Sequence, residues 1–145
     1  MRFLILNGVN LNMLGIREPE IYGKQTYDDL CRFIKVCCQE ENIDYDILQT
    51  NMEGQLVNYI QQAYQKYDGI IINAGAYTHY SIAILDALKA VAIPYVEVHL
   101  SDICDREEFR KNSITGLASV KIVKGLGFDS YKVGIKTLKD YLLEK

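Results

Sequence analysis

The sequence predicts a three-layer α/β fold in which a parallel sheet is covered by helices on both faces. Three observations lead to this prediction. Short apolar runs alternate with amphipathic stretches along the whole chain. One run, GIIIN at 69–73, is continuous and β-branched, as in strands that are buried on both faces. The 145 residues suffice for one domain of this kind, which we place at residues 1–145.

The elements follow one another in a regular order. Five runs are predicted as strands, at 2–7, 44–48, 69–73, 93–98 and 120–123. Four stretches with a helical period are predicted as helices, at 26–41, 56–67, 81–91 and 131–142. Thr26 with Asp29 resembles a capping pair for the first helix, and Thr78 is a candidate cap for the third. This alternation implies a five-stranded parallel sheet with the flavodoxin-like order 2-1-3-4-5.

Composition excludes several classes of function. A net charge of −3 leaves no basic surface for nucleic acid, and no apolar run is long enough to span a membrane. Residues 1–7 have a strand pattern rather than that of a signal peptide. The cysteines at 31, 37, 38 and 104 form no C-x-x-C pair and, with two histidines, no zinc-like cluster. We therefore expect free thiols, no metal and a cytoplasmic location.

Ligands of such sheets bind beyond the carboxyl ends of the strands, so the loops there carry the candidate residues. The loop at 7–23 is unusually long for its position, and long loops are often lids. It contains the polar residues Asn10, Asn12, Arg17 and Tyr22, and glycines at 8, 15 and 23 that could act as hinges. The alternative is a mobile surface loop whose glycines only make turns.

The loop after the third strand, at 73–81, offers a second set of candidates. Gly75 lets the backbone approach a ligand closely, and the start of the next helix presents free N–H groups to a carboxylate. His79 lies in this turn, although a lone histidine here is more often structural.

The loop after the fourth strand, at 96–110, offers a third set. Glu97 and His99 are two residues apart and therefore share one face of a strand. A carboxylate beside an imidazole orients the ring and favours its protonated, proton-donating form. Ser101 and Arg110 follow, whereas the glutamates at 107 and 108 fit a solvated helical turn.

Several common chemistries do not fit these loops. The chain has no Ser/Thr/Gly-rich FMN loop, no G-x-G-x-x-G or Walker motif and no G-x-S-x-G elbow. Asn73 stands where a response regulator needs aspartate. The remaining groups form an acid–base site suited to abstracting a proton next to a carbonyl in an anionic substrate. Arg17 or Arg110 near Tyr22 would favour tyrosinate, which a phenol with an ordinary pKa of about 10 needs to act as a base.

Four blocks of sequence carry a family resemblance. LNGVNLNMLGIREPEIYG, NMEGQLVNYIQQA, GIIINAGAYTHYSIAILDAL and VEVHLSDICDREEFR resemble, in order and spacing, the signature blocks of type II 3-dehydroquinate dehydratases. The resemblance spans nearly the whole chain. It implies a flavodoxin-like lyase of the shikimate pathway or of quinate breakdown, which converts 3-dehydroquinate to 3-dehydroshikimate. It implies anti elimination through an enolate, without cofactor, metal or Schiff base.

The resemblance also implies roles for individual residues. Tyr22 would take the C2 proton, Arg17 would stabilise the developing charge, and Asn10 would position the water or enolate oxygen. His99, held by Glu97, would protonate the departing hydroxyl. A further set would bind the substrate, partly through the backbone: Asn73, Gly75, Ala76, His79, Leu100, Ser101 and Arg110.

Asp86 has a separate expected role at a subunit interface. In the family, the matching aspartate reaches a neighbouring subunit's site, and the family assembles trimers into a dodecamer. A helix would place His79 and Asp86 on one face, too far apart for one small substrate to touch both. The helix at 81–91 is also apolar nearly all round, as expected at an interface. The alternative is an ordinary surface charge.

The chain departs from the family pattern at three positions, none of which removes a catalytic group. Val9 stands in place of the usual proline, Tyr80 in place of a frequent threonine, and Asp102 in place of a common asparagine. Two other functions stay open at this point. One is a binding module without catalysis, and the other is an imine-forming enzyme that would use Lys121 or Lys124 near the fifth strand.

Overall fold

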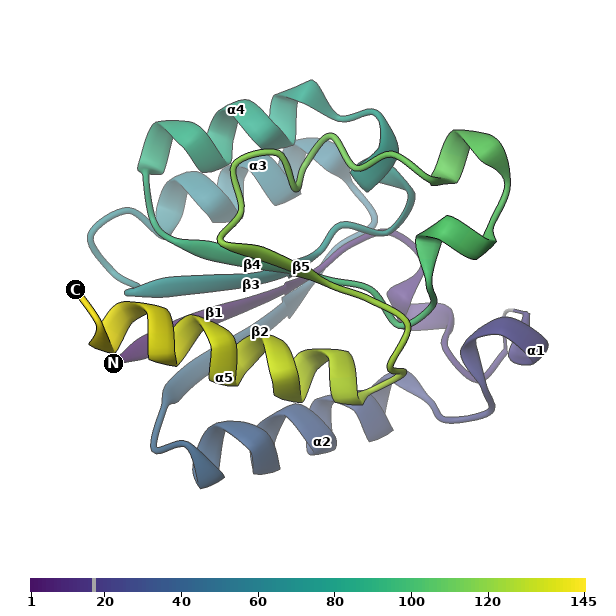
Figure 1. Cartoon of the computed structure of the whole chain (residues 1–145), viewed down its shortest axis with the longest axis horizontal. Coiled ribbons are helices and arrows are strands. Elements are labelled where there is room, and N and C mark those ends of the chain that lie inside the picture. The colour runs from purple at the N-terminus through teal and green to yellow at the C-terminus, as the bar shows by residue number, and fades with distance from the viewer. Residues whose placement is uncertain (17) are drawn as a thin grey trace.

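The computed structural model describes residues 1–16 and 18–145, and only the backbone of Tyr22. Within this part of the chain, five parallel strands form one sheet in the order β2-β1-β3-β4-β5, which confirms the predicted order (Figure 1). The strands are β1 (Arg2–Asn7), β2 (Asp44–Gln49), β3 (Gly69–Asn73), β4 (Tyr95–Val98) and β5 (Lys121–Val123).

Helices cover both faces of the sheet. The α-helices are α1 (Pro19–Tyr22), α2 (Tyr27–Glu40), α3 (Glu53–Gln62), α4 (Ile82–Val91) and α5 (Asp129–Leu143). Short 3-10 helices lie in the loops: η1 (Leu11–Met13), η2 (Gly75–His79), η3 (Ile103–Asp105) and η4 (Glu108–Arg110). In Figure 1, α3 and α4 lie on one face of the sheet, and α2 and α5 lie on the other.

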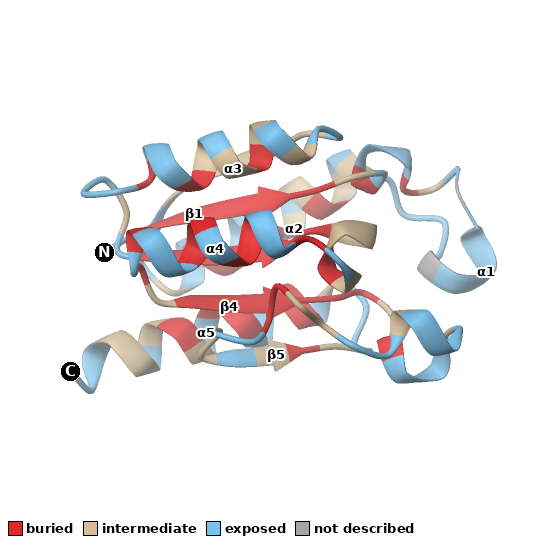
Figure 2. Ribbon diagram, turned by 90° about the horizontal axis from the view of Figure 1, so that it is seen from above, coloured by how far each residue is buried: buried red, intermediate tan, exposed pale blue. Residues whose placement is uncertain are grey.

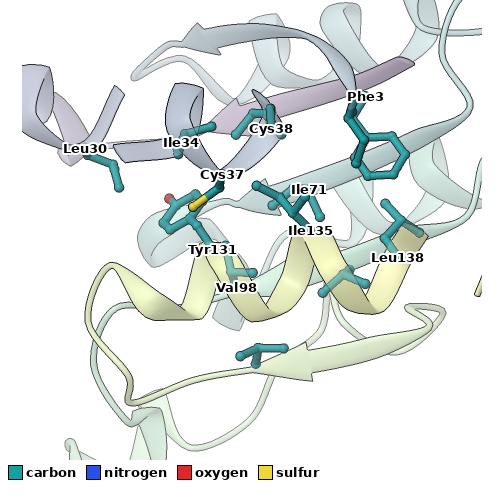
Figure 3. Close-up of a cluster of buried hydrophobic side chains, with 14 of the residues drawn as sticks. Phe3, Leu30, Ile34, Cys37, Cys38, Ile71, Val98, Tyr131, Ile135 and Leu138 are labelled. Carbon is teal, nitrogen blue, oxygen red and sulfur yellow. The ribbon is translucent and has the colours of Figure 1, made fainter. Parts of the chain in front are cut away.

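The core has two halves because side chains of a strand alternate between the faces of the sheet. In β1, Phe3 and Ile5 pack with α2 and α5, whereas Leu4 and Leu6 pack with α3 and α4. Figure 3 shows side chains of α2 and α5 meeting in the first half. Each buried side chain of this size contributes about 1.5–3 kcal/mol to folding. Figure 2 shows that β1 and β4 are buried, whereas the outer surfaces of the helices are exposed. Because the strands are parallel, their carboxyl ends lie at one edge of the sheet.

Helix α2 begins as predicted. The Thr26 hydroxyl accepts a hydrogen bond from the Asp29 N–H (3.1 Å), and the Asp29 carboxylate accepts one from the Thr26 N–H (2.9 Å). This reciprocal capping box satisfies two N–H groups that the helix leaves without partners.

The predicted cap of the third helix was wrong. Ser81, rather than Thr78, caps α4, and its hydroxyl accepts the Ile84 N–H at 3.1 Å. Gly75 adopts φ 64 and begins the 3-10 turn η2, which takes up residues 75–79 before the helix starts. The buried Thr78 hydroxyl has no hydrogen-bond partner among the described residues.

The bounds of α3, α5 and β4 also differ from the prediction by two residues or more. Helix α5 begins two residues earlier than predicted and α3 three residues earlier. Helix α3 ends at Gln62, not near 67, because the chain turns at Gln65, which adopts φ 63. The Tyr67 side chain then packs on the core, and its hydroxyl donates to Asp46 at 2.5 Å. Strand β4 begins at Tyr95 rather than 93, directly after Pro94, which has no N–H to donate to a neighbouring strand.

Candidate active site

A cavity lies beyond the carboxyl ends of β1, β3 and β4. It is lined by Val9, Asn10, Leu11, Leu14, Asn73, Gly75, Ala76, His79, His99, Leu100, Ser101, Ile103, Arg106 and Arg110. Strands β2 and β5 end at the same edge, but the loops that follow them contribute no lining residue within the described part of the chain. Three separate segments thus bring together polar groups that are far apart in the sequence.

The loops after β1 and β3 pack backbone against backbone. The Gly8 N–H donates to the Asn73 carbonyl at 2.7 Å, and a Cβ added to Gly8 would lie 2.5 Å from the Ala74 carbonyl oxygen. A Cβ on Gly75 would lie 2.6 Å from the Val9 carbonyl oxygen. Real Cβ atoms do not approach backbone so closely, so both positions need glycine. Gly8 is therefore fixed by packing and is no hinge.

A buried polar network supports the cavity from beneath. The Tyr131 hydroxyl, on α5, donates to Asn7 Oδ1 at 2.6 Å and accepts from Asn73 Nδ2 at 3.2 Å. Asn73 Oδ1 in turn accepts the Gly75 N–H at 3.2 Å. Burial raises the pKa of Tyr131, so its hydroxyl stays protonated and keeps donating. This network fixes the orientation of the Asn73 amide at the edge of the cavity.

Asn10 is held by residues that the sequence analysis did not single out. It adopts φ 69, and its N–H donates to Asn51 Oδ1 at 3.0 Å. Gln49 Nε2 donates to the same Asn51 oxygen (3.1 Å) and to the Gly8 carbonyl (3.2 Å). Both supporting residues lie at the end of β2 or just after it. Their position at a strand end is the signal that could have found them.

Glu97 and His99 form a buried pair at the end of β4. Glu97 is 0% exposed and His99 is 6% exposed, and His99 Nε2 lies 2.9 Å from Glu97 Oε2. Burial alone would raise the pKa of Glu97, but the contact with His99 and hydrogen bonds from Ser113 and Thr115 outweigh it and lower the pKa. Glu97 therefore stays ionised behind His99, and only His99 faces the cavity.

His79 lies in the turn after β3, as predicted, and it lines the cavity. Its Nδ1 is 2.8 Å from the Asn112 carbonyl oxygen, which can only accept. Burial is the main cause that lowers the pKa of His79, so the ring is neutral at neutral pH. Nδ1 then carries the proton, and Nε2 is a hydrogen-bond acceptor.

The predicted carboxylate seat at the start of α4 was wrong. The Ile84 N–H is bonded to Ser81, and the Ile82 N–H is bonded to the Tyr80 carbonyl at 3.0 Å. No described residue of α4 lines the cavity. The 3-10 turn η2 displaces the helix start from the site, so anionic groups must be held by other donors.

Two arginines supply positive charge to the cavity wall. Arg110 Nε lies 2.9 Å from the Glu107 carboxylate. Arg106, which the sequence analysis did not single out, lies 3.8 Å from Glu18 in the loop after β1 and 3.4 Å from the Ser101 hydroxyl. Its place in a charged RE-rich segment gave no sign that it faces inward. Glu107 and Glu108 are exposed on or beside η4, as predicted.

Among the described site residues that the sequence analysis named, Glu97 lies behind His99 and Asp86 lies away from the cavity, so neither lines it. Asp86 is exposed on α4, and because His79 is on η2 the two do not share one helix face. Tyr22 ends α1, and nothing is described of its side chain. Arg17 lies outside the described residues.

Glu97 provides a test of the buried pair through pH. Its folded-state pKa lies below the ordinary carboxyl value, so its contribution to stability is complete above about pH 5 and is lost as the pH falls through the folded-state pKa. We expect the free energy of unfolding of the wild type to fall more steeply from about pH 5 to about pH 3 than that of Glu97→Gln. Urea unfolding of both proteins over this range measures it. Parallel curves would show that the pair does not depress the Glu97 pKa.

The fold and the site define an α/β protein with an acid–base cavity at the carboxyl edge of its sheet. The family model described as dehydroquinase class II matches residues 1–139. The 3-dehydroquinate dehydratases of Clostridium acetobutylicum and Fusobacterium nucleatum are each 53% identical to this chain. The first alignment covers 98% of this chain and 99% of the relative, and the second covers 97% and 98%. The chain therefore belongs to the class II dehydroquinase family.

Solved structures agree with this assignment. The type II dehydroquinase from Butyrivibrio crossotus is 45% identical, with a TM-score of 0.94 over 96% of this chain and 97% of that one. The enzyme from Propionibacterium acnes is 38% identical, with a TM-score of 0.89 over 98% and 96%. Within the described residues, no helix is both long enough and apolar enough to cross a membrane.

Proposed function

We propose that the chain is a lyase that dehydrates 3-dehydroquinate to 3-dehydroshikimate, in aromatic amino-acid biosynthesis or in quinate breakdown. The buried Glu97–His99 pair at the wall of the cavity is the observation that carries the proposal. It supplies an oriented proton donor beside two arginines that suit an anionic substrate. Family membership and relatives that are named 3-dehydroquinate dehydratase support the same reaction.

The proposed mechanism is an anti elimination through an enolate. Tyr22, as tyrosinate, takes the proton from C2, and Arg17 stabilises the negative charge that develops. The hydroxyl on the neighbouring carbon then leaves as water after His99 protonates it. Because His99 Nε2 is held by Glu97, Nδ1 is the nitrogen that delivers this proton. Asn10 orients the water or the enolate oxygen. The proton acceptor and donor are side chains, so the reaction needs no cofactor.

The remaining lining residues are proposed to bind substrate. Arg110 and the backbone of Leu100 and Ser101 hold the carboxylate, with Asn73 oriented by its buried network. The neutral His79 accepts a hydrogen bond at Nε2, which suits a substrate hydroxyl. Gly75 and Ala76 contribute backbone at close range.

We further propose that the protein assembles into trimers and that these form a dodecamer, with Asp86 completing a neighbouring subunit's site. Asp86 is exposed on α4 next to apolar surface, since Ile82 is 63% exposed and Tyr80 is 61% exposed. Sedimentation at equilibrium tests the assembly.

We place the protein in the cytoplasm, where its four free cysteines would stay reduced.

Absorbance at the enone band of 3-dehydroshikimate tests the reaction. Purified protein is added to 3-dehydroquinate with a chelator and without added cofactor, and a steady rise that depends on the protein is expected. A flat trace from folded protein would contradict the proposal and favour a binding module.

Borohydride with substrate tests the imine route, and the protein mass is expected to stay unchanged. No lysine is among the described residues that line the cavity.

A further inference from the structure

Two hydroxyls meet the Glu97 carboxylate from a segment that no motif identified. Ser113 and Thr115, here called the hydroxyl pair, lie between η4 and β5. The Ser113 hydroxyl donates to Glu97 Oε2 at 2.6 Å, and the Thr115 hydroxyl donates to Glu97 Oε1. With His99 Nε2 also on Oε2, three donors surround a carboxylate that is 0% exposed.

The surrounding backbone keeps the hydroxyl pair in place. The Ser113 hydroxyl accepts the Gly116 N–H at 2.9 Å, which polarises it as a donor to Glu97. The Thr115 carbonyl accepts the Tyr95 hydroxyl at 2.5 Å, and the Thr115 N–H donates to the Thr78 carbonyl at 3.3 Å. A Cβ on Gly116 would lie 2.9 Å from Glu97 Oε2, so only glycine leaves room for this arrangement.

The hydroxyl pair acts on the charge of Glu97 without touching the cavity. Neither residue is among those that line it. A buried carboxylate without donors has a raised proton affinity, whereas hydrogen bonds to its charged form lower that affinity. In the pair with His99, a more basic Glu97 would draw the shared proton toward itself and leave His99 a weaker acid. The hydrogen bonds that Glu97 accepts therefore influence whether the shared proton stays on His99 or moves to Glu97.

We propose that Ser113 and Thr115 are positioning residues for the proton donor His99. They hold Glu97 as an oriented carboxylate, so the imidazole keeps its proton and presents Nδ1 to the cavity. This inference rests on the proposed function for its effect on turnover. Its effect on the His99 ring itself can be measured without any reaction.

Thr115→Val tests the inference because it keeps the shape of the side chain and removes the hydroxyl. We expect kcat to fall about tenfold, the effect of losing one hydrogen bond to a buried charged group. KM should stay within about twofold because the hydroxyl does not line the cavity. Thr115→Ser, which restores a hydroxyl, should recover most of kcat. Ser119→Ala is the matched control, since that hydroxyl donates to the Gly116 carbonyl at 2.7 Å and not to Glu97.

A double variant separates positioning from a merely structural role. In a Glu97→Gln background, Thr115→Val should have little further effect on kcat, because the hydroxyl acts through the carboxylate. Unchanged kcat in Thr115→Val, or an equal loss in both backgrounds, would overturn the inference.

A measurement on the free protein keeps the test independent of turnover. Long-range ¹H–¹⁵N spectra of the two imidazoles should show the His99 Nε2 resonance moving in Thr115→Val, with the His79 resonances nearly unchanged. This result would support the inference even if the wild type did not dehydrate 3-dehydroquinate, an outcome that would reject only the proposed function. Unmoved His99 resonances would reject the hydroxyl pair as positioning residues, whatever the activity.

Discussion

Replacing His99 with alanine is expected to lower kcat about a thousandfold, within the range for loss of a general acid. The departing hydroxyl would then leave without protonation from the enzyme, and elimination would depend on water. The fold should persist, because the Glu97 carboxylate keeps its hydrogen bonds from the Ser113 and Thr115 hydroxyls. Steady-state assays measure the loss, and circular dichroism establishes that the variant is folded.

His99→Gln is the matched comparison for this experiment. Glutamine can donate to Glu97 and fill the space of the imidazole, but it cannot protonate a leaving group at neutral pH. It should therefore be as inactive as alanine while unfolding closer to the wild-type temperature. If His99→Gln kept more than about a tenth of the wild-type kcat, another group would have to be the acid.

Replacing Tyr22 with phenylalanine is expected to remove most turnover, by at least about a hundredfold. The change removes one hydroxyl, and with it the proposed acceptor of the C2 proton. The global fold should be unaffected, because Pro19, Glu20 and Ile21 of the short helix α1 are exposed and none of them contributes to the buried core. Assays at saturating substrate measure kcat directly.

Tyr64→Phe is the control for this substitution. It makes the same chemical change at a side chain that is 57% exposed and not among the lining residues of the cavity. Its kcat should stay near that of the wild type in the same assay. Near-normal activity of Tyr22→Phe would exclude tyrosinate as the base and remove the mechanism proposed above.

The architecture could be predicted because burial imposes a period on the sequence. Strands β1 and β3 have the predicted bounds, because both are continuous apolar runs inside the sheet that helices cover on both faces. The incorrect boundaries lie where the backbone conformation of one residue decides where a helix begins or ends. Examples are Gly75 and Gln65, which both adopt positive φ. A period of apolar residues continues through such a turn, so it cannot locate the turn.

The candidate site could be predicted only in part, for a related reason. Asn73, His79 and His99 stand out because they are polar and follow strands in sequence. The supports of the site belong to other segments: Asn51 holds the Asn10 loop, and Thr115 holds Glu97. Their roles depend on contacts between distant parts of the chain, and serine, threonine or asparagine in a loop has many ordinary explanations.

The distribution of the cysteines has a practical consequence for measuring ligand entry. Burial raises the pKa of Cys37 to about 11 and of Cys38 to about 12, and it also raises the pKa of the half-buried Cys31. Cys104 is exposed and directly follows Ile103, which lines the cavity. Because the thiolate is the form that reacts, a maleimide dye should attach at Cys104 first. The native chain thus offers a single fluorescent reporter beside the cavity, without any engineered residue.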